Sequence, residues 1–309
     1  MGSTEVILVG VDGSTESLAA TAWAADRAKI TGAKVHVICT YALASYSAAA
    51  LDGGYTVLDD EALKRGAELV VEDAVKHAKE RGATNISSSV EPGDPAGILV
   101  EMSAEVDLVV VGSRGGGGFT DRLLGTVSSA LPAHAKCPVV VVPRHTSGKH
   151  FTPVERIVVG VDGSEVASAA LKRSVDEALA WKARLTAVSA VPIASTGSMM
   201  SWLPTQVDRV ALLKDVREGL TKAVASAVDG RDLEVPCHAL DGSPASLLIE
   251  FSTAVDLVVV GTRGRGGFAG VLLGSTSQTV LHHSTCPIMI VPSRHKDAHS
   301  APAGAWERR

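Results

Sequence analysis

Residues 107–126 read DLVVVGSRGGGGFTDRLLGT: an apolar run stops, and four consecutive glycines follow almost at once. The pattern returns in residues 256–275, DLVVVGTRGRGGFAGVLLGS. Glycine loses more conformational freedom on folding than any other residue, so a run of glycines is costly to order. Since this feature occurs twice, each time after a predicted buried strand, it indicates a function for the segment.

The two glycine-rich segments belong to a longer internal repeat. The halves open with VILVGVDGS (residues 6–14) and RIVVGVDGS (residues 156–164), and they close with KCPVVVVP and TCPIMIVP. The stretch between them, RHTSGKHFTP, is polar and contains Gly and Pro, as linkers do. We therefore predict two homologous domains, over residues 1–145 and 152–293, followed by a flexible tail over residues 294–309.

Within each half, short β-branched runs alternate with Ala-rich stretches. Continuous apolar runs such as LVVV predict strands that are covered on both faces, as in a parallel sheet between helices. The predicted fold class is α/β, with two tandem doubly wound, Rossmann-like domains, each a five-stranded, mostly parallel sheet flanked by helices. The predicted strands span residues 6–11, 35–40, 86–90, 108–111 and 139–142 in the first half, and 157–161, 185–191, 234–239, 257–260 and 288–291 in the second. The predicted helices of the first half follow Ser14 to about Ile30, span residues 59–81 and run from Pro95 to about Ala104.

Composition narrows the class of protein. No apolar run approaches the roughly 18 residues of a membrane helix, and the N-terminus does not resemble a signal peptide, so we expect a cytoplasmic protein without membrane contact. The net charge of -5 gives no basic footprint for nucleic acid. The four cysteines lack CxxC spacing and are interpreted as buried thiols, with metal or disulfide roles as minor alternatives.

In doubly wound sheets, ligands bind beyond the carboxyl ends of the strands. The VDGS turn follows the first strand and the glycine segment follows the fourth, so Asp12 and Gly112 are expected at one edge from 100 residues apart. Glycines let backbone amides converge on an anion, and a helix start adds further amides and the positive end of its dipole. This arrangement favours a phosphate. Hydroxyls near the helix starts can cap those helices or reach a phosphate oxygen or metal; they belong to Thr126, Ser128, Ser275 and Ser277.

The segment is neither a Walker A loop nor a Rossmann fingerprint, because no Lys-Ser/Thr pair follows the glycines and the segment comes after the fourth strand. Its spacing is glycine, two residues, glycine, nine residues, then glycine and a hydroxyl, twice. In this motif, and across both halves, the sequence closely resembles the tandem form of the universal stress protein family, in its ATP-binding branch. The resemblance implies one ATP in each half, with Mg as its expected companion.

The resemblance also implies a role for each motif residue. The glycine segment and the hydroxyl after it would meet the ribose and phosphates, and the aspartate after the first strand would face the adenosine. The adenine edge would meet main chain near Thr40 and Tyr41 in the first half and near Ala190 and Val191 in the second. The implied sites are Asp12, Gly112, Gly115, Gly125 and Thr126, and Asp162, Gly261, Gly264, Gly274 and Ser275, with Ser128 and Ser277 as further candidates.

Other interpretations of these residues stay open. Asp12 and Asp162 stand in Asp-Gly-Ser before a helix, where Asp is a common turn residue. Arg114 and Arg263 follow the strand at equivalent places, where either a phosphate or a surface salt bridge suits them. The histidines near the last strand have no matching carboxylate or cysteine spacing and are interpreted as surface or packing residues; they are His134, His282 and His283.

Three classes of function follow. The first is an ATP-binding regulator of stress or dormancy responses that acts through nucleotide-dependent conformation or partner binding. The alternatives are a slow Mg-dependent ATPase and a nucleotide-free interaction module, and no catalytic residue or metal ligand is assigned. The last strand of each half is apolar and expected at a sheet edge, which proteins cover. The resemblance implies that the two halves pair within one chain, and the sequence leaves a homodimer open.

Overall fold

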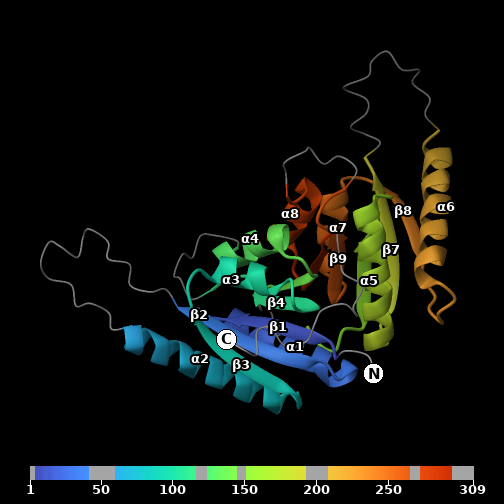
Figure 1. Ribbon diagram of the computed structural model, residues 1–309. Coiled ribbons are helices and arrows are strands. Elements are labelled where there is room, and N and C mark those ends of the chain that lie inside the picture. The colour runs from blue at the N-terminus through green and yellow to red at the C-terminus, as the bar shows by residue number, and fades with distance from the viewer. Residues whose placement is uncertain are drawn as a thin grey trace, which may run out of the picture. The chain divides into compact units, whose positions relative to one another are not determined.

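The computed structural model describes residues 4–41, 60–115, 124–144, 151–192, 208–264 and 272–293 (Figure 1). The chain divides into two compact units, and the boundary between them falls between Cys137 and Pro138. Strands and helices alternate along both units. The α/β class and the tandem Rossmann-like organisation predicted from the sequence are confirmed.

The first unit holds a parallel sheet of order β3-β2-β1-β4 among its described residues. Helices α1 and α2 pack on each other and on the sheet, α3 packs on α4, and the two pairs cover opposite faces (Figure 1). This is the doubly wound arrangement expected from right-handed crossovers. The elements are β1 (Val6–Val11), α1 (Thr15–Thr31), β2 (Lys34–Tyr41), α2 (Asp60–Glu80), β3 (Ile86–Pro92), α3 (Pro95–Met102), β4 (Leu108–Gly112) and α4 (Thr126–His134).

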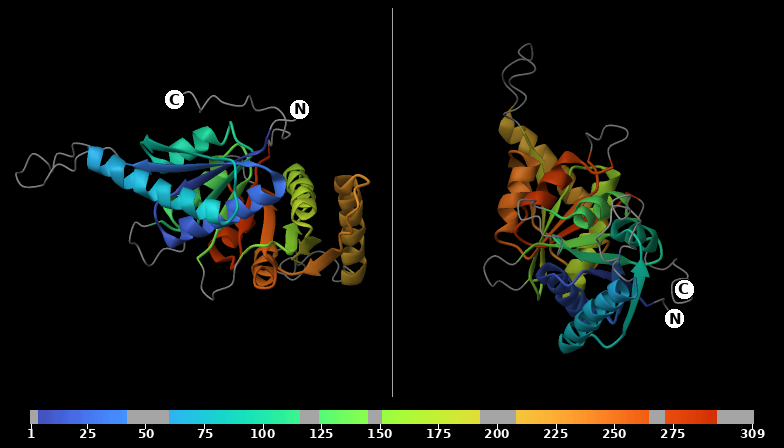
Figure 2. Two further views of the ribbon diagram at one scale, coloured as in Figure 1. Left: turned by 90° about the horizontal axis from the view of Figure 1, so that it is seen from below. Right: turned by 90° about the vertical axis from the view of Figure 1, so that its left-hand side faces the viewer.

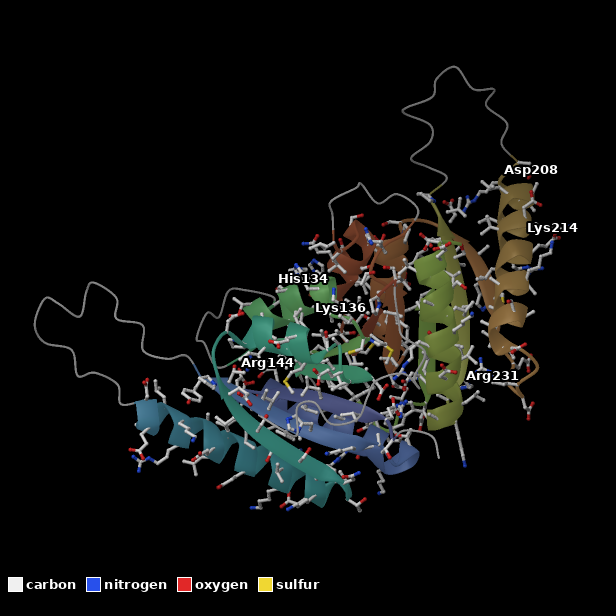
Figure 3. All side chains as sticks on the ribbon, in the orientation of Figure 1. His134, Lys136, Arg144, Asp208, Lys214 and Arg231 are labelled. Atoms are coloured by element: carbon white, nitrogen blue, oxygen red, sulfur yellow. The ribbon has the colours of Figure 1, made fainter. Side chains whose placement is uncertain are left out.

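The second unit repeats this plan with the sheet order β5-β10-β9-β6-β7-β8. Helix α5 packs on α6 and α7 on α8 (Figure 2). Asp208 caps the start of α6, and Arg231 lies just beyond its end (Figure 3). The elements are β5 (Val139–Val142), β6 (Arg156–Gly160), α5 (Glu165–Trp181), β7 (Arg184–Val191), α6 (Arg209–Val228), β8 (Cys237–Asp241), α7 (Pro244–Ser252), β9 (Leu257–Gly261), α8 (Ser275–His283) and β10 (Ile288–Val291).

Strand β5, which the sequence repeat places in the first half, clusters with the second unit. It pairs antiparallel with β10, whereas the other paired strands described in this unit run parallel. All four residues of each strand are buried. The ladder covers two apolar strands that would otherwise present unpaired backbone to solvent. Pairing of the two halves as whole domains stays a prediction.

One predicted strand begins later than expected. The internal repeat predicted a strand from residue 234, but β8 begins at Cys237. Pro236 has no amide hydrogen to give to a neighbouring strand. Its carbonyl oxygen instead accepts a hydrogen bond from the nitrogen of Ala187, at 2.9 Å, and regular pairing with β7 starts one residue later.

Both units are built around strands of branched apolar residues. The residues of β4 from Leu108 to Val111 are at most 3% exposed, and those of β9 from Leu257 to Val260 at most 4%. Such burial on both faces explains why these strands read as unbroken apolar runs. Within the residues that the structure describes, no helix combines the length and apolarity that a membrane crossing requires.

Candidate functional sites

A tight turn follows the first strand of each unit. Gly13 has a φ of +80°, a value that favours glycine, and the glycine after Asp162 has the same value. Oδ1 of Asp12 accepts hydrogen bonds from the nitrogen of Ser14 at 3.0 Å and from its hydroxyl at 2.6 Å. Oδ1 of Asp162 accepts one from the nitrogen of Ser164 at 3.0 Å. Both aspartates are exposed and shape the turn, the role that sequence alone left as an alternative.

The hydroxyls at these turns start the next helix. The Oγ of Ser14 accepts a hydrogen bond from the nitrogen of Ser17, and that of Ser164 accepts one from the nitrogen of Ala167, each at 3.1 Å. Ser14 is the N-cap of α1, as the sequence predicted, and Ser164 is that of α5. Turn, cap and helix therefore form one unit that fixes where each aspartate lies.

The aspartate turn meets the start of the glycine segment. A Cβ atom placed on Gly115 would overlap Oδ2 of Asp12, and one placed on Gly264 would overlap Oδ2 of Asp162. The hydroxyl of Ser14 also lies 3.4 Å from the carbonyl oxygen of Arg114. The structure thus brings together two motifs that lie about 100 residues apart in each half. This contact explains why both positions are glycine, because any side chain there would displace the carboxylate.

The glycines that end β4 and β9 serve helix packing. A Cβ on Gly112 would lie 2.7 Å from the main-chain carbonyl carbon of Glu16, in the first turn of α1. A Cβ on Gly261 would lie 2.7 Å from Cγ1 of Val166, in the first turn of α5. Real Cβ contacts are not this short, so glycine lets each helix approach the end of its strand. Their binding role stays a prediction, while the structure gives them a packing role that the sequence did not reveal.

The far end of each glycine segment returns to the strand that it left. The nitrogen of Gly125 donates to the carbonyl oxygen of Ser113 at 2.8 Å, and that of Gly274 to the carbonyl oxygen of Thr262 at 2.7 Å. Gly125 and Gly274 are the N-caps of α4 and α8 and have no side chain that could accept a bond from the first-turn amides. The helix starts therefore present backbone donors, as an anion site needs.

The four hydroxyls near these helix starts fall into two kinds. Thr126 and Ser275 are the first helical residues and are exposed. Ser128 and Ser277 are buried, and their Oγ atoms donate to the carbonyl oxygens of Ser113 and Gly261, each at 2.7 Å. None of the four is a helix N-cap, because that position belongs to the preceding glycine.

The expected adenine edge lies where β2 and β7 end. The carbonyl oxygen of Tyr41 accepts a hydrogen bond from the nitrogen of Gly93 at 2.9 Å, and that of Val191 accepts one from Gly242 at 3.1 Å. In this structure Thr40 and Tyr41 belong to β2, and Ala190 and Val191 belong to β7. A carbonyl oxygen has two lone pairs, so these atoms keep capacity for a ligand.

Cys39 is a neighbour of the first site that sequence reasoning missed. It pairs with Val11 in the β1–β2 register, one residue before Asp12. Burial of the thiol, followed by the charge of Asp12, raises the pKa of Cys39 from 9.0 to about 11. The thiol therefore stays protonated at neutral pH and behaves as a small apolar group. The sequence could have revealed this neighbour, because aligning the first two predicted strands in parallel places Cys39 beside Val11.

Some of the remaining candidates, the histidines among them, lie within the described residues, and others lie outside them. His134 Nδ1 lies 2.9 Å from the carbonyl oxygen of Ala130, and burial, followed by the charge of His283, lowers the pKa of His282. No group of three potential metal-ligating side chains occurs among the described residues. Residues 116–118, 265–271 and 294–309, which include three of the four consecutive glycines and the predicted tail, lie outside the described ranges.

Known proteins resemble this chain along nearly its whole length. The model of the universal stress protein family matches residues 4–143 and 153–292. The universal stress protein Rv2623 of Mycobacterium tuberculosis H37Rv is 32% identical over 299 residues, which cover 92% of this chain and 95% of that relative.

Solved structures that cover most of this chain share its fold. A universal stress protein of Archaeoglobus fulgidus superposes with a TM-score of 0.64 at 20% identity, covering 93% of this chain and 96% of that one. A shorter universal stress protein, crystallised in complex with cAMP, is 33% identical with a TM-score of 0.35 and covers 46% of this chain and 98% of its own. With two family domains matched along its length, this chain belongs to the universal stress protein family, in its tandem form.

Proposed function

We propose that each half of the chain binds one ATP at the carboxyl end of its sheet, giving two sites per chain. In this proposal the nucleotide controls conformation or partner binding in a cytoplasmic stress or dormancy response. One observation carries it: in both units, an exposed aspartate carboxylate packs against the start of a glycine segment whose far end opens a glycine-capped helix. The proposed domains keep the bounds 1–145 and 152–293, with a flexible tail beyond them.

The phosphates are assigned to the starts of α4 and α8. First-turn amides that lack a side-chain cap attract an anion, and the helix dipole adds about 0.3–1 kcal/mol for a favourable charge. The exposed hydroxyls of Thr126 and Ser275 stand at the same helix ends and are available as donors. A Cβ on Gly125 would meet only ordinary contacts at 3.6 Å, so this glycine is better explained by approach of a ligand than by crowding.

The adenosine is assigned to the aspartates and to the ends of β2 and β7. A carboxylate accepts hydrogen bonds at several positions, and Asp12 and Asp162 each use Oδ1 for the turn. A ribose supplies the hydroxyl donors that such a group binds. The adenine edge is assigned to main chain near Tyr41 and Val191, beside the same two turns.

Magnesium is included in the proposal as a companion of the phosphates. Mg²⁺ usually keeps several waters and takes one or two protein oxygens together with the phosphates. The described residues contain no cluster of three ligating side chains, and a phosphate-held ion needs none. The exposed hydroxyls of Thr126 and Ser275 are the protein oxygens that we assign to it.

Titration with Mg-ATP tests the two sites separately. We expect two tightly bound ATP per wild-type chain, one for Asp12→Ala, one for Asp162→Ala and none for the double variant, in which both sites keep only weak, still measurable binding. Asp215→Ala, which removes an exposed carboxylate from α6, is the matched control and should leave two. Two tightly bound ATP in the double variant would refute the assignment of the aspartates.

Two further measurements separate the remaining classes of function. Phosphate release in a single turnover distinguishes a slow ATPase from a protein that only holds ATP. A chain that binds no nucleotide at all is an interaction module. Pairing of the two halves through their last strands, and a possible homodimer, belong to the proposal and are tested by light scattering of the purified chain with and without ATP.

A further inference from the structure

In each unit, one buried hydroxyl joins the two ends of the glycine segment. Ser128 is 1% exposed, and its Oγ donates to the carbonyl oxygen of Ser113 at 2.7 Å. Ser277 is 5% exposed, and its Oγ donates to the carbonyl oxygen of Gly261 at 2.7 Å. In both units a side chain from the first turn of the helix after the segment reaches back to the end of the strand before it.

A backbone hydrogen bond closes the segment beside each hydroxyl. In the first unit the amide of Gly125 and the hydroxyl of Ser128 share the carbonyl oxygen of Ser113. In the second unit the two acceptors differ: the amide of Gly274 donates to the carbonyl oxygen of Thr262, and the hydroxyl of Ser277 donates to that of Gly261, one residue earlier. Two hydrogen bonds thus fasten the chain where it leaves the strand to the point where it enters the helix.

We propose that Ser128 and Ser277 are positioning residues that hold the first-turn amides of α4 and α8 in place, and that they do so without touching the phosphates. A serine hydroxyl has one proton to donate, and here that proton goes to main chain in a buried setting. Each serine acts on a ligand indirectly: it fastens the start of its helix, and with it the first-turn amides beyond the N-cap glycine, to the end of the strand. The effect on nucleotide rests on the proposed function, whereas the closing of the segment rests on these hydrogen bonds alone.

The same helices supply matched controls. Ser129 in α4 and Thr279 in α8 are exposed, and their hydroxyls donate to the carbonyl oxygens of Gly125 and Ser275, four residues earlier, at 2.7 and 2.8 Å. Removing either hydroxyl deletes the same chemical group close to its buried counterpart. It leaves the link between helix and strand intact.

The test compares Ser128→Ala and Ser277→Ala with Ser129→Ala and Thr279→Ala in the full chain. Hydrogen exchange is measured at the amides of Gly125 and Gly274, and affinity is measured for Mg-ATP and for adenosine, which lacks phosphates. Since one hydrogen bond contributes about 0.5–1.5 kcal/mol, we expect each buried-serine variant to speed exchange at its own glycine and to weaken Mg-ATP at that site, each by about 2-fold to 12-fold. Adenosine affinity should not change, and both control variants should have the exchange rates and ATP affinity of wild type. Ser128→Thr keeps the hydroxyl, so its exchange rate at Gly125 and its ATP affinity should also be those of wild type.

Three other outcomes would overturn the inference, and a fourth would separate it from the proposed function. Unchanged exchange and unchanged ATP affinity would remove any role for the hydroxyl in closing the segment. Weaker ATP binding with unchanged exchange would make the serine a direct ligand, and equal losses for ATP and adenosine would make its role general to the fold. If wild type binds no ATP but exchange still accelerates in Ser128→Ala, the proposed function fails while the closing role stands.

Discussion

Replacing Gly115 with alanine should disturb the first site through Asp12 alone. The new Cβ would overlap Oδ2 of that aspartate, so the carboxylate must move. It is not free to move without loss, because its Oδ1 accepts hydrogen bonds from the nitrogen and the hydroxyl of Ser14, at 3.0 and 2.6 Å. Since Asp12 and Gly115 are both exposed, the buried core is not involved.

The size of the effect follows from those two hydrogen bonds. Each hydrogen bond contributes about 0.5–1.5 kcal/mol net, so disturbing both costs roughly 1–3 kcal/mol. If ATP binding requires the turn in its present form, that energy is subtracted from binding. With tenfold in affinity for each 1.4 kcal/mol, ATP at the first site weakens by about 5-fold to about 140-fold.

A double-mutant cycle checks the cause. Wild type, Gly115→Ala, Asp12→Ala and the pair are titrated with Mg-ATP in chains that also carry Asp162→Ala, so that only the first site responds. Because Asp12→Ala removes the atoms that the new methyl group meets, alanine at position 115 should weaken binding no further in that background. Gly264→Ala with Asp162→Ala repeats the cycle in the second unit, where the same overlap occurs.

The control is Gly219→Ala, in α6, where a Cβ meets nothing within 4 Å. It should leave ATP affinity unchanged and stabilise the helix by up to about 1 kcal/mol. Equal weakening of ATP binding by Gly115→Ala in the Asp12→Ala background and in wild type would refute the predicted overlap with the carboxylate. That result would place the methyl group against the ligand and not against the carboxylate.

Two further substitutions test the surroundings of the first site. Gly112→Ala should destabilise the fold by about 1–3 kcal/mol in urea unfolding, because its Cβ would lie 2.7 Å from the main chain of Glu16; unchanged stability would contradict the packing role. The pKa of Cys39 is raised in the folded chain, so its contribution is full below pH 9 and is lost as the pH rises through about 11, a change of about 2–3 kcal/mol. Cys39→Ser should therefore flatten the loss of stability between pH 8 and 11, and an equally steep loss would count against it. Asp12→Asn should lower the pKa of that thiol, seen as faster alkylation at a given alkaline pH; an unshifted pH profile would show that the two groups do not interact.

Much of the fold could be predicted because its strands are unusually uniform. The run LVVV predicted a strand over residues 108–111, and β4 ends one residue later, at Gly112. Ser14 was predicted as a helix start and is the N-cap of α1. The repeat then extended each assignment to the second half. The repeat gave the wrong start near Pro236, which lacks a backbone donor, and β8 begins at Cys237.

Less of the site could be predicted. A glycine in the sequence indicates that another group comes close to the backbone, but it does not indicate which group. Gly112 and Gly115 look alike in the motif, yet one faces the backbone of α1 and the other a carboxylate. A hydroxyl is similarly ambiguous. Thr126 is exposed at the helix start, whereas Ser128, two residues on, faces inward and bonds to the strand. Only the position of the first turn of α4 beside Ser113 decides between these roles.

The most direct test of two ATP sites is to purify the chain, saturate it with Mg-ATP, remove free nucleotide, denature the protein and count the released nucleotides by chromatography and mass spectrometry. We expect close to two adenine nucleotides per chain, and one in a chain that carries Asp12→Ala. Release of no nucleotide from the saturated wild-type chain would contradict the claim that the two aspartate–glycine contacts form ATP sites.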